Sequence, residues 1–181
     1  LGGAGPALAG DRAALAAASR AAVEDRVAAE RMLIAWRAPP ASPEVAALAH
    51  VVMPLLTHAQ LGRLSRAIAH EQKLATRVRG SFELGPWVSA VSFEIVPSVL
   101  HDLAVAERAL LTELHVLAHA GPREDELRAA KAIARARVHR ERAPGGRGPR
   151  PGEPLRAHGT LAAEDVDRVS VEHVRSFVAS V

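Results

Sequence analysis

The hydrophobic positions between residues 61 and 84 change their spacing partway along this segment. Leu61, Leu64 and Ile68 recur every three to four residues, which is the spacing of one face of an α-helix. From Leu74 onward the pattern alternates, which is typical of a β-strand with one buried face. The apolar side carries Leu74, Val78, Phe82 and Leu84, and the polar side carries Arg77, Arg79, Ser81 and Glu83. A helix that leads directly into such a strand predicts a sheet with helices on one face.

Two other segments have the character of strands. The segment from Met32 to Arg37 is apolar and is stopped by Pro39-Pro40. After the tight connection at Gly85-Pro86, apolar residues alternate again, at Trp87, Val91, Phe93 and Ile95. We therefore predict an α+β fold, with an antiparallel sheet and helices packed on one face. Its expected strands lie near residues 31–37, 74–84 and 87–96.

Capping residues predict where the first helices begin and end. Ser42 followed by Pro43 predicts a helix start. Pro54 is expected to end or kink that helix, because proline has no N–H to donate. Thr57 and Gln60 have the spacing of a capping box, so we expect the next helix to begin there.

Four further helices are predicted toward the C-terminus. Ser98 is the expected N-cap of a long helix that Gly121 ends, and Pro122 begins another helix, with an acidic first turn. The last two are expected at residues 161–168 and 171–180.

The remaining segments have no clear period. Residues 1–23 are expected to form an entry segment with a short helix from Asp11. Residues 143–159 are rich in proline, glycine and arginine, which predicts a flexible surface loop. We expect the basic residues there to be part of a disordered loop rather than a site for an anionic partner; these are Arg142, Arg147 and Arg150. No internal repeat is visible, so residues 1–181 are interpreted as a single domain.

Composition narrows the functional classes. Hydrophobic residues make up 49% of the chain but aromatic residues only 3%, so leucine, valine, isoleucine and alanine must fill the core. The formal net charge is only +3, and charges of both signs alternate along the predicted helices, which favours solvated faces over a nucleic-acid surface. No apolar run approaches the ~20 residues that cross a bilayer. We expect neither nucleic-acid binding nor a membrane span. The absence of cysteine leaves the compartment open, with the bacterial periplasm and the cytoplasm as alternatives.

Several short motifs resemble one known family. Arg63-Leu64-Ser65-Arg66 on the predicted helix and Glu71-Gln72-Lys73-Leu74-Ala75 before the strand resemble the pitrilysin or insulinase-type zinc metallopeptidases. That family includes the insulin-degrading enzymes and the mitochondrial processing peptidase. The segment from Leu33 to Pro40 is similar to the strand and turn before this helix, and Gly121-Pro122 with the following acidic turn is similar to a later helix. The resemblance covers residues 24 to 181 and is to the second domain of a subunit, which does not hold the zinc.

The resemblance also implies what this chain lacks. The family's zinc site uses His-x-x-Glu-His, in which two histidines bind the metal and the glutamate takes a proton from the bound water. No such motif occurs in this sequence. The family's second domain often carries an arginine on the helix and a tyrosine seven residues later; the matching positions are Ala69 and Thr76, which supply neither a cation nor a phenol. We therefore expect no catalytic residue, no bound metal and no activity of this chain alone.

Two functional hypotheses follow from the resemblance. In the first, the chain is a non-catalytic domain of a zinc peptidase-like protein, shaping the substrate chamber or the subunit interface. A partner domain or subunit of the same family would then bind the zinc and hydrolyse the peptide. In the second, the chain is a degenerate scaffold or binding subunit of a complex without peptidase activity.

Arg77 and Arg79 are candidates for peptide contact, because they lie on the polar face of the predicted strand. The alternative is a solvated sheet face, or pairing of these arginines with Glu83 and Glu94 across the hairpin. Fold analogy does not by itself decide between these interpretations.

His115 and His119 have the i, i+4 spacing that can chelate a metal on a helix. They share their face with Arg108 and Thr112, and a metal centre needs three or four converging ligands. Solvated surface histidines are therefore the preferred interpretation.

Overall fold

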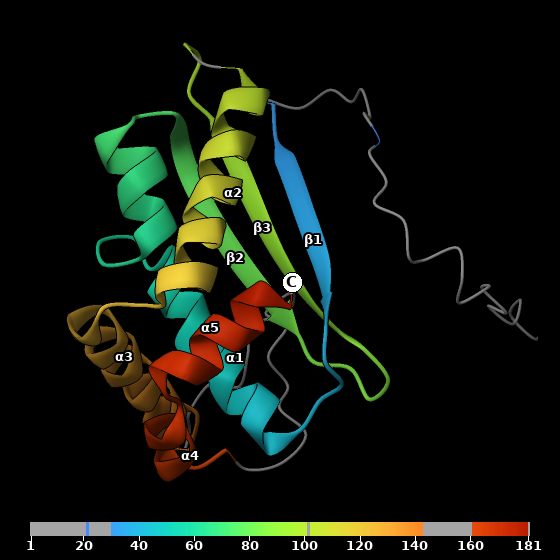
Figure 1. The fold of residues 1–181 in the computed structure, drawn as a ribbon, viewed down its shortest axis with the longest axis vertical. Coiled ribbons are helices and arrows are strands. Elements are labelled where there is room, and N and C mark those ends of the chain that lie inside the picture. Colours follow the sequence, from blue (N-terminus) through green and yellow to red (C-terminus); the bar gives the residue numbers. More distant parts are fainter. Residues whose placement is uncertain (1–20, 22–29, 101, 143–160, 181) are drawn as a thin grey trace, which may run out of the picture.

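Three alternating segments form one antiparallel sheet (Figure 1). The structure is a computed structural model that describes residue 21 and residues 30–100, 102–142 and 161–180. Its strands are β1 (Met32–Ala38), β2 (Ala75–Glu83) and β3 (Ser89–Pro97). The strand order is β1-β3-β2, and both pairings are antiparallel. The α+β class and the predicted β2–β3 hairpin are thus confirmed.

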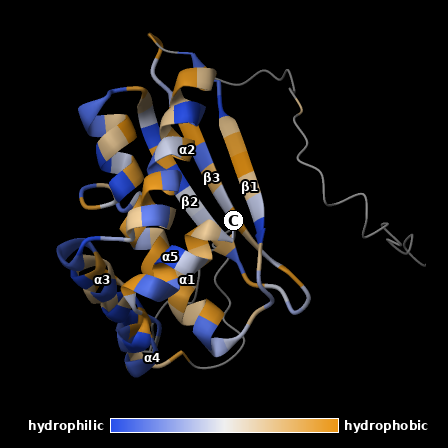
Figure 2. Ribbon diagram, viewed as in Figure 1, coloured by the Kyte–Doolittle hydropathy of each residue, from blue (hydrophilic) through white to orange (hydrophobic). Residues whose placement is uncertain are grey.

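The helices lie on one side of this sheet, and α2 runs across it in Figure 1. They are α1 (Pro43–Thr57), the π-type helix η2 (Ser65–Glu71), α2 (Leu103–Ala120), α3 (Glu124–Arg142), α4 (Ala163–Arg168) and α5 (Val171–Ala179). Helix α1 packs against β2, α3 and α4, while α2 packs against α5, η2 and β3. Hydrophilic residues predominate on α3 (Figure 2). None of the helices in the described part of the chain could span a membrane.

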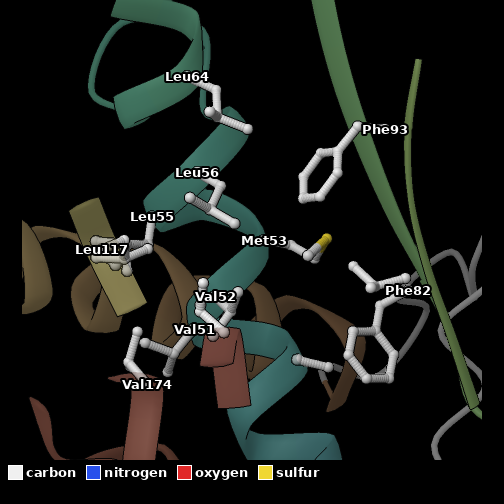
Figure 3. Close-up of a cluster of buried hydrophobic side chains, with 14 of the residues drawn as sticks. Val51, Val52, Met53, Leu55, Leu56, Leu64, Phe82, Phe93, Leu117 and Val174 are labelled. Carbon is white, nitrogen blue, oxygen red and sulfur yellow. The ribbon is translucent and has the colours of Figure 1, made fainter. Parts of the chain in front are cut away.

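The core lies between the sheet and α1. Met53 of α1 points toward Phe82 and Phe93 of the sheet, and the opposite side of α1 faces Leu117 and Val174 (Figure 3). Burial of α1 on both sides explains why its sequence is apolar nearly all round. Phe82 is fully buried, and its ring centroid lies 5.6 Å from that of Phe177 on α5.

Helix α1 passes through Pro54 and continues to Thr57, so of the two predicted outcomes, a helix end or a kink, the end is excluded. Burial of the helix outweighs the one hydrogen bond that proline removes. The predicted capping box at Thr57 and Gln60 was wrong. Thr57 does not cap the next helix, because its hydroxyl donates a hydrogen bond back to the Met53 carbonyl at 2.9 Å. Instead, the Nδ1 atom of His58 accepts from the N–H groups of Gln60 and Leu61 in the intervening turn.

The predicted start of the long helix was also wrong. Helix α2 begins at Leu103, because the carboxylate of Asp102 accepts a hydrogen bond from the Ala104 N–H at 2.9 Å. Ser98 stabilises only a local turn, in which its hydroxyl accepts from the Leu100 N–H. The predicted helix end at Gly121 is confirmed, and this residue has a φ of 73°, which favours glycine.

Trp87 lies outside the strand that its alternation predicted. Strand β3 begins only at Ser89, and the Trp87 side chain in the connecting loop is 84% exposed.

Helix α3 begins two residues after Pro122, and the two C-terminal helices are present as α4 and α5. The predicted helix from Asp11 and the predicted loop at 143–159 lie outside the described residues.

Candidate functional site: the open face of the sheet

The described helices leave one face of the sheet uncovered. Along β1, Leu33 and Arg37 are exposed, whereas the alternate residues Ile34 and Trp36 are partly buried under the helices. In β2 and β3 the side chains likewise alternate between the side under the helices and the opposite side. We call the uncovered side the open face. It comprises Arg31, Leu33, Ala35, Arg37, Arg77, Arg79, Ser81, Glu83, Ala90, Ser92 and Glu94.

The strand register places small side chains in the middle of the open face. Ala35 of β1 lies opposite Ser92 of β3, which lies opposite Ser81 of β2. The hydroxyls of Ser81 and Ser92 are joined by a hydrogen bond of 2.7 Å. On one side of this small-residue row, Glu94 of β3 lies between Leu33 and Arg79. The row of small side chains therefore has a row of larger and charged side chains beside it.

The two predicted contact residues lie on this face but in different environments. Arg77 Nη2 is 3.6 Å from Glu94 Oε1, and the same oxygen accepts a hydrogen bond from Arg31 Nη1 at 3.3 Å. The pairing of Arg77 with Glu94, which the sequence offered as an alternative to peptide contact, is present. Arg79 lies beside Glu94 in register and is exposed, and it forms no ion pair with another described residue. Arg79 is thus the more available of the two cations.

Sequence reasoning missed the contribution of the first strand to this surface. Arg31 and Arg37 extend the basic character of the open face across β1. Their spacing follows the same period of two as Leu33 and Ala35, so the alternation in residues 31–37 could have predicted that both arginines lie on this face. What the sequence lacked was the strand order, which brings β1 next to β3 and allows Arg31 to reach Glu94.

Ala69 and Thr76 are placed on consecutive elements at one end of β2. Ala69 is half-buried in η2. Thr76 is exposed at a β-bulge, where Ala75 opposes Pro97 and Arg77 opposes Val96. The Thr76 hydroxyl donates to the Val96 carbonyl at 3.2 Å, so it takes part in the local structure of the strand. The match of Ala69 and Thr76 to the family's auxiliary arginine and tyrosine stays a prediction from the resemblance.

His115 and His119 stack on the exposed side of α2. Their ring centroids are 4.0 Å apart, and His119 Nδ1 lies 2.9 Å from the His115 carbonyl oxygen. Both line the rim of an apolar cavity of about 300 Å³ between α2, α5 and the sheet, near Trp36 and Leu114. Within the described residues, no group of three or more histidine, cysteine, aspartate or glutamate side chains is arranged to hold a metal.

A second cavity, of about 420 Å³, lies between the start of α1 and the C-terminal helices. Its walls are mainly apolar, and both signs of charge occur among its lining residues, with Glu44 and Asp165 set against Arg168. Asp165 and Arg168 already form an ion pair at 3.0 Å. Two carboxylates and one arginine therefore line this cavity, and one of the carboxylates is already paired with the arginine.

Comparison with known proteins gives matches in structure only. No protein-family model matches the sequence, and no curated protein matches it. A protease from Helicobacter pylori has a TM-score of 0.71 at 13% identity, over 87% of this chain and 39% of that chain. An inactive peptidase domain from Bordetella parapertussis has a TM-score of 0.61 at 21% identity, over 87% of this chain and 90% of that chain. The peptidase M16 inactive domain from Pseudomonas fluorescens has a TM-score of 0.56 at 16% identity, over 81% and 36%. This chain has the fold of M16-like peptidase domains.

The resemblance predicted from the motifs is confirmed at the level of the fold. The chain spans about two fifths of the Helicobacter protease (39%) and 90% of the Bordetella domain. At these identities the likeness concerns the fold and carries no activity over to this chain.

Proposed function

We propose that this chain is a non-catalytic domain of a zinc peptidase-like protein and that its open face lines the chamber that holds the substrate. The observation that carries the proposal is the asymmetry of the sheet. One face is packed under helices, while the other presents charged and small side chains, on a fold shared with inactive peptidase domains. A face that is solvated over three strands is available to an extended peptide or to a second domain.

In this proposal another domain or subunit of the same family supplies the zinc. His-x-x-Glu-His is absent from the sequence, and the described residues include no cluster of three metal-binding side chains. A zinc ion in the partner would polarise the peptide carbonyl and activate a water. The role of this chain would be to hold the peptide in place and to exclude water around it. We expect no hydrolysis from the chain alone.

A scaffold role is the second candidate, and one comparison favours it. A chain of Complex III2 from Candida albicans has a TM-score of 0.62 with this chain at 15% identity, over 83% of this chain and 39% of that one. The same fold therefore also occurs in a chain of that complex. In a scaffold, the open face would be buried against a neighbouring subunit and would contact no substrate.

Reconstitution separates the two candidates. The purified chain is mixed with a subunit from the same genome that carries His-x-x-Glu-His, and hydrolysis of a quenched peptide is followed with and without a chelator. We expect a stable complex whose chelator-sensitive activity exceeds that of the zinc-bearing subunit alone by about tenfold or more, because positioning of the substrate contributes strongly to rate. A stable zinc-loaded complex without activity would favour the scaffold. Equal activity with and without this chain, and no complex, would refute the proposal.

A matched pair of variants tests the open face in the same assay. Arg79→Ala removes the exposed arginine from the open face, whereas Arg128→Ala removes an exposed arginine from α3, on the helical side. If the open face lines the chamber, only Arg79→Ala should raise KM. Equal kinetics for both variants would count against substrate contact at this face.

A further inference from the structure

We propose that the open face selects peptides that carry carboxylate side chains in an extended conformation. The inference rests on the proposed function, because it specifies which substrates the chamber would favour.

The balance of charge on the open face is positive. Four arginines and two glutamates lie there, namely Arg31, Arg37, Arg77, Arg79, Glu83 and Glu94. Glu94 Oε1 is already shared by Arg31 and Arg77, so its charge is compensated within the sheet. Exposed arginine binds carboxylates in a planar, two-hydrogen-bond geometry. An acidic side chain is therefore the complementary partner of this surface.

The spacing of the two β2 arginines fits an extended peptide. Arg77 and Arg79 project from the same side of one strand, about 7 Å apart along it. Alternate side chains of an extended peptide have the same separation, so carboxylates at positions i and i+2 can face both guanidinium groups. Arg77 Nε is buried, whereas its Nη2 atom lies 3.6 Å from Glu94 Oε1 and the side chain as a whole is 41% exposed, so the outer end of the guanidinium group is the part that a ligand can reach.

The open face favours a peptide over a single-stranded nucleic acid. Proteins that bind single strands stack bases on aromatic side chains. Among the described residues of the open face there is no aromatic side chain, since Trp36, Phe82 and Phe93 all lie on the helical side. The small-residue row of Ala35, Ser92 and Ser81 instead leaves space for a polypeptide beside the arginines.

The test uses the full chain and three peptides of equal length, in which alanine alternates with glutamate, glutamine or lysine. Binding is followed by amide chemical shifts of the ¹⁵N-labelled chain, which detect weak association. We expect the glutamate peptide to shift resonances of β2 and β3 and to bind about tenfold more tightly than the glutamine peptide, because Arg79 gains an ion pair and Arg77, which lies 3.6 Å from Glu94, adds a second positive charge beside it. Arg79→Glu should abolish this preference and increase binding of the lysine peptide. Arg128→Ala should leave all three affinities unchanged, and the spectra report directly whether each variant is folded.

The outcomes separate this inference from the proposed function. If the glutamate and glutamine peptides bind the open face equally, charge selection is refuted while peptide contact stands. If no peptide binds, both the selection and the peptide-lining role are refuted. If oligothymidylate binds more tightly than the glutamate peptide and Arg79→Glu abolishes this, the face is a nucleic-acid surface and the inference is wrong. If acidic peptides bind as expected but no zinc-bearing partner is activated, the inference stands and the chamber proposal fails.

Discussion

Arg66 of η2 donates a hydrogen bond through Nη2 to Oε1 of Glu126 on α3 at 3.0 Å, across 60 residues of sequence. The Glu126 side chain is only 6% exposed, and it also lies 3.6 Å from Arg63 Nη1 and accepts a hydrogen bond from the Arg123 N–H at 3.1 Å. Burial acts to raise the pKa of Glu126, but the Arg123 N–H and the Arg66 and Arg63 guanidinium groups outweigh it and hold this pKa below its ordinary value. The carboxylate therefore joins η2, the helix before β2, to α3.

Replacement of Glu126 should weaken the fold. Glu126→Gln keeps the size of the side chain but removes the buried negative charge that Arg63 and Arg66 share, so that only Glu113 and Glu71 remain as their anionic partners. We therefore expect a loss of about 2 kcal/mol in the free energy of unfolding. Chemical denaturation measures this loss. Asp125→Asn is the matched control on the same helix, because this carboxylate is well exposed and should leave stability nearly unchanged. Equal effects of the two substitutions would show that the Glu126 cluster does not hold the helices together.

The sequence predicted this cluster only in part. Arg63 and Arg66 stood out within a motif, and the acidic start of α3 stood out as a helix signal. Each was interpreted locally, because helix periodicity gives no information on which distant helix packs against which. The same limit applies to the open face, where alternation identified Arg77 and Arg79 but only the strand order added Arg31 and Arg37.

Strands were predicted better than helix boundaries, and the reason is physical. A strand buried on one face alternates along its whole length, so β1, β2 and β3 could be located within a few residues. A helix start depends on which of several nearby groups caps it. Thr57 and Ser98 both had capping character, but Thr57 bonds to the preceding helix and Asp102 caps α2 in place of Ser98. The π-type geometry of η2, with its Gln72 N–H to Ala67 carbonyl bond, left no recognisable pattern.

Phe82 is the next test of the core. Its burial was predicted from the apolar side of the alternating segment that forms β2, and the structure confirms it with an exposure of 0%. Phe82→Ala should lower the free energy of unfolding by roughly 3–5 kcal/mol, because a large cavity forms beside Phe177. Leu33→Ala is the control, since Leu33 is 72% exposed on the open face. A loss below about 1 kcal/mol for Phe82→Ala would be inconsistent with a well-packed site.

Gly80 is expected to tolerate no larger side chain. A Cβ atom at this position would lie 2.9 Å from Thr57 Cγ2 and 3.2 Å from Phe93 Cε1, and the Thr57 hydroxyl is bonded to Met53. Gly80→Ala should therefore cost roughly 1–3 kcal/mol through overpacking. Thr57→Ser removes the clashing methyl group and keeps the hydroxyl, so the double variant should recover much of the loss. Additive effects in this double-mutant cycle would rule out the proposed clash.

His50 should make stability depend on pH. Burial of this α1 side chain lowers its pKa from the ordinary 6.5, while Glu141 of α3 acts to raise the pKa and Arg137 of α3 to lower it. The Nδ1 atom has no hydrogen-bond partner. Because the unfolded chain binds a proton more readily than the folded one, the free energy of unfolding should fall as the pH drops below about 6.5.

The pH effect is checked by denaturation between about pH 7.5 and pH 5. His50→Gln cannot titrate, so its stability should decline less steeply over this window than that of the original chain. His139→Gln replaces an exposed histidine of α3 and should retain the steep decline. Parallel curves for the original chain and His50→Gln would assign the pH dependence to other groups.

The purified chain alone should bind no stoichiometric zinc and cleave no peptide. It lacks His-x-x-Glu-His, and the positions that match the family's auxiliary arginine and tyrosine are Ala69 and Thr76. His115 and His119 provide two imidazoles at most, while a catalytic zinc needs three protein ligands and an open position. Elemental analysis of the tag-free chain and hydrolysis of a quenched peptide test this. One zinc per chain together with chelator-sensitive cleavage would contradict it, and loss of both in a His115→Ala, His119→Ala double variant would then identify the stacked pair on α2 as ligands.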